Sequence, residues 1–357
     1  MEAESATALS AASTTADRWE HGSNLPVSFD VGNMRAPWDT APRTFWASGR
    51  DALRALVEWG VANHGWRRMY VPSYYCQDAL VPLQSVIPME AYAHGPTARV
   101  VEPVVAREGD IALVVSLFGA EPAPVVSAGG SVVDDHTHDP LSPWALNSTS
   151  EYAFASLRKT LPLPDGGVLW SPQRRPLPAD APVTLAHDRA TLDRLAAMIL
   201  KHHYLAGADV AKDEFRAVAL SGEEMIGKGE VSGMSSYSRA RLPSLPGAEW
   251  RERRAANLAA LRTALGEHRG VTLLDVPFAA MLVFESRERR ERVREALLQS
   301  KIYPTIYWPL EDPAVSGIPA SDVATSRRIL GIHCDYRYTA GDMERVAKVL
   351  QGALVVA

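Results

Sequence analysis

The chain has 357 residues, of which 46% are hydrophobic, so it is long enough for a large packed core and too long for one small module. Its formal net charge of -5 excludes the basic surface typical of nucleic-acid-binding domains, and the chain is not acidic enough to indicate general disorder. Two cysteines, Cys76 and Cys334, form neither a disulfide framework nor a zinc pattern, so we expect a reduced, cytoplasmic protein.

The start of the chain is polar and rich in Ala, Ser and Thr. It lacks the basic and apolar regions of a signal peptide, and we predict a disordered N-terminus over 1–22. No run in the chain approaches the roughly 18 apolar residues of a membrane span, so we expect neither a membrane nor a nucleic acid as partner.

Helix and strand patterns alternate in the first part of the chain. Apolar residues recur at helical spacing in "SGRDALRALVEWGVANHG" (48–65), between a Ser-Gly turn and a closing glycine. Four short apolar runs of the kind that form buried strands follow, at 67–76, 110–119, 129–139 and 151–159. Strands that alternate with helices over more than 100 residues predict an α/β domain with a mostly parallel sheet.

The pattern from Arg189 to Leu265 is helical, with one segment over 189–215 and a long amphipathic helix over 249–268. After Gly270, strand patterns lie at 271–276, 279–286 and 302–308, and helical patterns at 287–300 and 341–354. This mixture predicts a smaller α+β domain at the C-terminus. We therefore expect a large domain over 23–267 and a small one over 268–357.

Ligands of open α/β sheets bind beyond the carboxyl ends of the strands. Polar groups that could meet there are therefore candidates for a functional site. The first is "SGRDAL" (48–53), a turn that opens a helix. Free backbone N–H groups and the helix dipole attract an anion such as phosphate at such a place. An ordinary helix cap is the alternative.

The second group is "VVDDHTHD" (132–139), in which a β-branched run ends at Asp134 and Asp135, before His136 and His138. A carboxylate at the end of a strand can pair with a protonated ring nitrogen. A metal site is a rival explanation, but no third cluster of ligands accompanies it. A loop of solvated polar residues is the other alternative.

The third group is "SLRKTLPLPDGG" (156–167), which holds Lys159 24 residues after Asp135. Two prolines stiffen this segment, and its two glycines permit a tight turn into the next strand. A surface lysine is the alternative. A phosphate seat, a carboxylate for a pyridinium nitrogen and a lysine amine are together what pyridoxal 5'-phosphate (PLP) requires of a protein.

With these segments the chain resembles the DegT/StrS family of fold type I PLP-dependent aminotransferases. It is most similar to a branch with "SGRxAL", "EDxTH" and "SLRKxLPxPDGG" segments, which here read "SGRDAL", "DDHTH" and "SLRKTLPLPDGG". The similarity continues through "KHHYL", "MSSYS", "RRAANLAAL" and "HCDYRYTAGDME", and so spans roughly Trp46 to Val349. It implies the fold type I architecture, with a large PLP-binding domain and a smaller C-terminal domain.

The resemblance implies catalytic roles for Lys159, which would form a Schiff base with the cofactor, and for Asp135, which would pair with its ring nitrogen. It places His138 beside the ring or its hydroxyl group, and it places Tyr75 or Cys76 where relatives carry a stacking aromatic residue. A buried structural thiol is the more ordinary role for Cys76.

The resemblance also implies a phosphate-binding turn formed by Ser48, Gly49, Arg50 and Asp51, with Ser156 assisting. It places Ser236 where sugar-specific members have the asparagine of a loop that reaches the neighbouring subunit. That difference weakens the case for a nucleotide-sugar substrate. Active sites in this fold are shared across a dimer, so a homodimer is expected.

Arg337, in "CDYRY", is a candidate anchor for a substrate carboxylate, and a surface salt bridge is the alternative. The leading functional hypothesis is a biosynthetic aminotransferase that uses a small amino donor and a small carbonyl acceptor. A PLP enzyme for elimination, decarboxylation or carbon–carbon bond formation is the second hypothesis, because it would use the same groups. A non-catalytic regulator is the third, although Lys159 and Asp135 are both intact.

Overall fold

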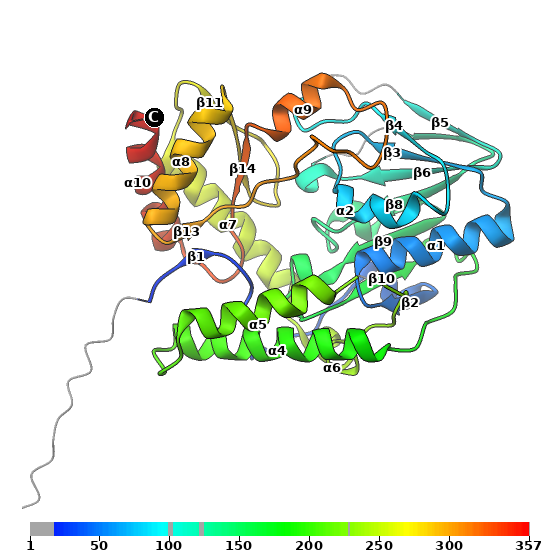
Figure 1. The fold of residues 1–357 in the computed structure, drawn as a ribbon, viewed down its shortest axis with the longest axis horizontal. Coiled ribbons are helices and arrows are strands. Elements are labelled where there is room, and N and C mark those ends of the chain that lie inside the picture. The colour runs from blue at the N-terminus through cyan, green and yellow to red at the C-terminus, as the bar shows by residue number, and fades with distance from the viewer. Residues whose placement is uncertain (1–17, 99–102, 121–124, 228, 357) are drawn as a thin grey trace, which may run out of the picture.

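The computed structural model describes residues 18–98, 103–120, 125–227 and 229–356 (Figure 1). Its centre is a seven-stranded sheet in the order β2-β10-β9-β8-β6-β3-β4. These strands are β2 (Arg43–Trp46), β3 (Arg68–Pro72), β4 (Met89–Tyr92), β6 (Asp110–Val115), β8 (Ser131–Asp135), β9 (Tyr152–Ser156) and β10 (Gly167–Trp170). Strand β10 runs antiparallel to its neighbours β9 and β2, and the other neighbouring pairs are parallel. The predicted α/β class with a mostly parallel sheet is confirmed.

The middle strands are buried along their whole length, as expected for a parallel sheet with both faces covered. Every residue of β6 and of β9 is buried. Helix α1 (Gly49–His64) packs on β9 and β10. Its start is capped by Ser48, and it ends at Gly65, whose φ of 64° is the left-handed conformation that glycine adopts easily. The predicted helix therefore begins and ends where its sequence signals lie.

The central helical region contains a helical hairpin where the sequence predicted one segment. Helix α4 (Leu185–Leu205) and helix α5 (Lys212–Met225) lie side by side in Figure 1, and they are joined by a turn with Gly207 at a φ of 91°. The short α6 (Ser236–Arg241) and the long α7 (Gly247–Leu265) follow. Trp250 near the start of α7 belongs to the core beneath the lysine segment, whereas Leu258 and Leu261 belong to a second core.

The second core lies between α7, helices α8 (Arg287–Gln299) and α10 (Ala340–Val356), and a three-stranded antiparallel sheet. The sheet has the order β11-β12-β14. Its strands are β11 (Val271–Leu273), β12 (Ala280–Phe284) and β14 (Ile329–Ile332). Helix α9 (Ala320–Ser326) precedes β14, a strand that the sequence pattern had not indicated. This arrangement matches the α+β character expected for the C-terminal part.

The N-terminal segment is more ordered than the sequence indicated. Of the stretch 1–22 predicted to be disordered, residues 1–17 lie outside the described residues. The rest of it is ordered, because β1 (His21–Gly22) pairs in parallel with β13 (Ile302–Tyr303) and the indole of Trp19 donates a hydrogen bond to Asp342. The prediction was wrong for residues 18–22, since their partners lie about three hundred residues further along the chain.

Smaller elements complete the described chain. They are the two-stranded parallel sheet of β5 (Val104–Arg107) and β7 (Val125–Ala128), α2 (Gln77–Leu80), and α3 (Pro143–Leu146). Within the described ranges, no helix combines the length and the apolar character needed to cross a membrane.

Candidate active site

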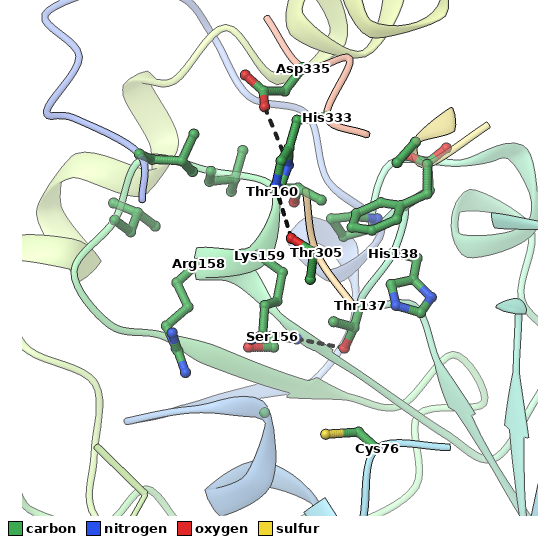
Figure 2. Close-up of a pocket in the computed structure, with 18 of the residues that line it drawn as sticks. Cys76, Thr137, His138, Ser156, Arg158, Lys159, Thr160, Thr305, His333 and Asp335 are labelled. Carbon is green, nitrogen blue, oxygen red and sulfur yellow. Dashed lines mark hydrogen bonds and ion pairs between the residues drawn. The ribbon is translucent and has the colours of Figure 1, made fainter. Parts of the chain in front are cut away.

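A cavity of about 510 Å³ gathers the sequence-predicted site residues at the carboxyl ends of the parallel strands (Figure 2). The predicted residues that line it are Ser48, Gly49, Arg50, Tyr75, Cys76, Asp135, His138, Ser156, Lys159 and Arg337. Asp51 and Ser236 are not among the residues that line it. Residues far apart in the sequence therefore meet in one place, as the sheet topology requires.

One end of the cavity is the N-terminus of α1. The Ser48 side chain accepts a hydrogen bond from the backbone N–H of Asp51, and the buried Asp51 carboxyl group receives a hydrogen bond from the Ser48 hydroxyl. Burial raises the pKa of Asp51. Asp51 thus completes the helix cap and does not face the cavity, which corrects its predicted contact with phosphate. The backbone N–H groups of Gly49 and Arg50 have no partner inside the helix and are available to an anion.

Two glycines let the lysine segment approach this helix end. A Cβ atom on Gly49 would lie 2.8 Å from the Cβ of Ser156, and one on Gly167 would lie 2.2 Å from the carbonyl oxygen of Ser48. Such distances are too short for non-bonded atoms, so only glycine fits at Gly167 without a shift of the backbone. The glycine that ends "LPDGG" is therefore needed for close contact with the anion-binding turn.

Lys159 ends a short 3-10 turn (Leu157–Lys159) that directly follows β9. Figure 2 shows the side chains of Lys159 and Arg158 extending in the same direction. The charge of Arg158, together with burial among protein atoms, lowers the pKa of Lys159 to about 8, although Glu223 and Cys76 oppose this shift. Lys159 as a residue nevertheless remains exposed to solvent, and it lines the open cavity. A lysine with this pKa is partly neutral near neutral pH and can act as a nucleophile.

Arg158 is held by a partner that sequence patterns did not reveal. Its two terminal nitrogens bind the carboxylate of Glu223 at 2.8 and 2.9 Å, and Arg194 binds the same carboxylate. Burial alone would raise the pKa of Glu223, but Arg158, Arg194 and Lys159 together lower it to about 2. Arg194 and Glu223 lie on α4 and α5, where charged residues in a helical pattern look like an ordinary solvated face.

Asp135 is the last residue of β8, and its carboxylate is buried. It accepts hydrogen bonds from the Tyr75 hydroxyl at 2.5 Å and from the backbone N–H of Thr137 at 2.8 Å. A carboxylate can accept about four hydrogen bonds, so it can take a further donor from the cavity. Tyr75 thus contacts Asp135 through its hydroxyl group. The neighbouring Asp134 accepts from Ser148 and does not line the cavity.

His138 and Cys76 also line the cavity. The Nδ1 atom of His138 accepts from the backbone N–H of Phe118 at 3.0 Å, and the ring stacks on Trp308 at 5.7 Å between centroids. Burial lowers the pKa of His138, so the ring is neutral. Burial raises the pKa of the Cys76 thiol, while Lys159 opposes this effect. A thiol with a raised pKa does not support a nucleophilic role for Cys76.

The structure shows Arg337 bound to other protein groups and not free for a substrate. Its guanidinium binds the carboxylate of Asp335 through two bonds of 2.7 Å, and it also donates to the carbonyl oxygens of Gly22, Ser23 and Asn24. Every nitrogen of the group therefore has a protein partner. Arg337 fixes the N-terminal segment, and a substrate carboxylate would have to displace those contacts.

Ser236 does not line the cavity of its own chain, its predicted place beside a neighbouring subunit stays a prediction, and the adjacent Ser235 has a structural role. Ser236 is exposed on α6, whereas the backbone and hydroxyl of Ser235 both donate to the buried carboxylate of Asp165 at 2.8 and 2.7 Å. Asp165 also binds His187 at 2.8 Å and the hydroxyl of Ser238. The aspartate of "LPDGG" thereby ties the lysine segment to α4 and α6. The sequence shows an aspartate before two glycines, but it does not show which residues bind this carboxylate.

No protein-family model matches the sequence, and no curated protein matches it. Solved structures do match. DesV of S. venezuelae, solved with a ketimine intermediate, has a TM-score of 0.57 at 15% identity, over 88% of this chain and 85% of that one.

Two further solved structures also match the fold of this chain. PseC of Helicobacter pylori, an aminotransferase of pseudoaminic acid biosynthesis, has a TM-score of 0.58 at 9% identity, over 95% of this chain and 100% of that one. The synthase of 3-amino-5-hydroxybenzoic acid has a TM-score of 0.53 at 14% identity, over 88% and 87% of the two chains. The chain has the fold of a type I PLP-dependent transferase. Identities this low establish the shared fold, and the activity has to be argued from the site.

The rival metal site is not supported by the described ranges. They contain no group of three or more His, Cys, Asp or Glu residues that could hold an ion. His136, the other histidine of the "DDHTH" segment, packs between Trp144 and Trp170, with ring centroids 4.0 and 5.4 Å apart.

Proposed function

We propose that this chain is a PLP-dependent aminotransferase that moves an amino group from an amino-acid donor to the carbonyl of a small metabolite. One observation carries the proposal. A lysine of lowered pKa, a buried carboxylate at a strand end and an open helix N-terminus line the same cavity. We also propose, from the sequence segments, that the chain belongs to the DegT/StrS family.

The residues of the cavity fit this cofactor. Gly49, Arg50 and Ser156 would hold its phosphate, because backbone N–H groups, a cation and a hydroxyl meet there. Asp135 would accept a hydrogen bond from the protonated ring nitrogen, and Lys159 would bind the aldehyde. When bound, the cofactor supplies an electron sink for negative charge that develops beside the amino group.

The protein's own groups would position and protonate the reacting parts. The amine of Lys159, with a pKa near 8, can release a proton and take it up again at neutral pH. The Arg158–Glu223–Arg194 cluster keeps a positive field beside that amine. Asp135 is held by Tyr75 and Thr137, so its carboxylate does not need to reorganise when it meets a cation.

Incubation of the protein with PLP and then with glutamate tests the proposal. We expect a yellow protein whose colour fades when glutamate is added, while 2-oxoglutarate is formed in equal amount. Lys159→Ala should abolish the covalent attachment, as seen by mass spectrometry after borohydride reduction, and Asp135→Asn should slow the reaction. Asp134→Asn is the matched control. A wild-type protein that stays colourless with PLP would contradict the assignment.

We further propose a homodimer with shared active sites. Leu185, Leu192 and Ile199 are exposed at intervals of seven residues along α4, which leaves an apolar stripe on that helix. Analytical ultracentrifugation gives the test, because a species of about 78 kDa is expected from two chains of 38.9 kDa. A single species with the mass of one chain would contradict it.

A further inference from the structure

The cavity presents a second, apolar face, and we infer that this face receives an acceptor substrate with an apolar body. The inference rests on the proposed function and names the class of its substrate. We call the face the leucine wall. Its residues belong to one hydrophobic cluster and all line the cavity: Leu25, Leu141, Leu161, Leu163, Trp250 and Tyr336.

The leucine wall is built next to the reactive amine. Leu161 and Leu163 follow Lys159 by two and four residues in the same segment, and they are 4% and 1% exposed. Leu25 and Leu141 are only half-buried, so their side chains leave apolar surface uncovered at the cavity. An apolar group of a substrate bound at Lys159 would cover this surface and displace water from it.

The aromatic part of the wall is rigid. Trp250 at the start of α7 stacks on Tyr336 with ring centroids 4.0 Å apart and an angle of 17° between the planes. Both rings are more than nine-tenths buried. They cannot rotate freely to present a different surface, so this side of the cavity offers the same apolar shape to every ligand.

The N-terminal segment that carries Leu25 is also fixed. The buried Lys201 donates to the hydroxyl of Ser23 at 2.5 Å and to the carbonyl of Asn24 at 2.7 Å. Arg337 also donates to the carbonyl oxygens of Ser23 and Asn24. Leu25 therefore forms part of the cavity before any substrate arrives, and binding does not have to order it.

Most polar side chains near the wall are already paired with one another. Thr305 and His333 share a hydrogen bond of 3.0 Å, Asp335 binds Arg337, and Asp139 binds Arg254 at 2.9 Å. Figure 2 shows the first of these pairs above Lys159. These groups already bond to one another, so fewer of their donors and acceptors remain for a ligand. A polyhydroxylated substrate would therefore replace only part of the hydrogen bonds that it makes to water.

Two buried hydroxyl groups on this side have no partner among the described residues. They belong to Tyr336 and Thr160, and both residues line the cavity. A buried hydroxyl group without a partner favours a ligand that supplies one. The substrate class that fits is a carbonyl compound with a hydrocarbon body and one or two polar substituents, as opposed to a sugar.

A matched pair of ketones tests this inference. The PLP-loaded protein is first converted with glutamate, and the return of the yellow colour is then followed with cyclohexanone or with its pentahydroxylated analogue. We expect the rate per unit concentration to be at least about 10-fold higher for cyclohexanone, because each unpaired hydroxyl on the analogue carries a cost. Equal rates, or a faster reaction of the hydroxylated ketone, would overturn the inference.

The two proposals fail in different ways in this experiment. If glutamate does not bleach the colour, the aminotransferase proposal fails. If glutamate bleaches it and the hydroxylated ketone is the better acceptor, only the apolar substrate class fails.

A binding measurement checks the wall without any reaction. Calorimetric titration of the PLP-loaded protein with cyclohexanol, which cannot react, should show tighter binding than titration with inositol. Leu141→Asn should weaken cyclohexanol binding by about 10-fold, because it places an amide in the apolar surface. Leu146→Asn, at an exposed leucine outside the cavity, is the matched control and should leave binding unchanged. If Leu141→Asn binds as tightly as the parent, the wall is not the binding surface.

Discussion

The low pKa of Lys159 depends on its neighbour in the sequence, and Arg158→Gln tests this dependence. The charge of Arg158 is the largest cause of the shift from 10.5 to about 8. At pH 7 a lysine with a pKa near 8 is about 10% neutral, compared with about 0.03% for a lysine at 10.5. If the substitution raises the pKa of Lys159 by about one unit, the neutral fraction of its amine at pH 7 becomes about ten times smaller.

The substitution has a second effect of the same sign. Arg158 binds Glu223, and without it this carboxylate, still bound by Arg194, would be less neutralised and would attract the protonated form of Lys159 more strongly. Both effects raise the pKa of the lysine. The reactivity of the amine, which increases as pH rises through the pKa, should therefore reach half of its maximum at a higher pH in the variant.

The assay is the rate at which Lys159 itself is acetylated, measured by mass spectrometry of its peptide at a series of pH values. It requires neither cofactor nor substrate. Arg189→Gln, which removes an exposed arginine paired with Asp193 outside the cavity, is the control and should leave the profile unchanged. A midpoint near pH 8 in Arg158→Gln would refute the argument that the neighbouring guanidinium sets this pKa.

Three further substitutions should act through buried contacts. Asp165→Asn should lower the free energy of unfolding by about 2–4 kcal/mol, because an amide cannot accept all the hydrogen bonds that the carboxylate receives. Glu20→Gln should cost about 2–4 kcal/mol, because the buried Lys201 loses its opposite charge. Both are measured by urea unfolding. Gly167→Ala should weaken PLP binding by more than about 10-fold in a fluorescence titration, since its Cβ would meet Ser48.

Controls for these substitutions are available at exposed positions. Asp188→Asn and Glu90→Gln remove exposed carboxylates and should change the unfolding free energy by less than about 0.5 kcal/mol. Gly352→Ala adds a methyl group with no atom within 4 Å and should not affect PLP binding. Unfolding energies for Asp165→Asn or Glu20→Gln no lower than those of the controls would contradict the roles given to these carboxylates.

Local sequence signals were sufficient for the middle strands of the central sheet and for part of the site, whereas β2 and β4 were not predicted. Continuous apolar runs predicted β6 and β9, and the Ser-Gly turn predicted the start of α1. Parallel strands bring their carboxyl ends to one edge, so Asp135 and Lys159 could be expected to meet there. These inferences needed only spacing and topology.

The remaining parts of the site depend on contacts between distant segments, which local patterns do not encode. Arg337 was a candidate anchor for a substrate, but its guanidinium binds Asp335 and the carbonyl groups of residues 22–24, which lie more than 300 residues away in the sequence. Glu223 carried no signal in the sequence that singled it out, although it binds Arg158. The sequence alone does not show whether a charged residue lies in solvent or pairs with a buried residue of opposite charge.

The attachment of the N-terminal segment has a consequence for the order in which the site is completed. His21 pairs with Ile302, and the backbone N–H of Gly22 donates to the hydroxyl of Tyr338. The ribosome makes these partners after residue 300, so β1 cannot pair with β13 until most of the chain has been synthesised, although Lys201 can bind the neighbouring residues earlier. A nascent chain can assemble its central sheet early, but its substrate cavity becomes whole only near release.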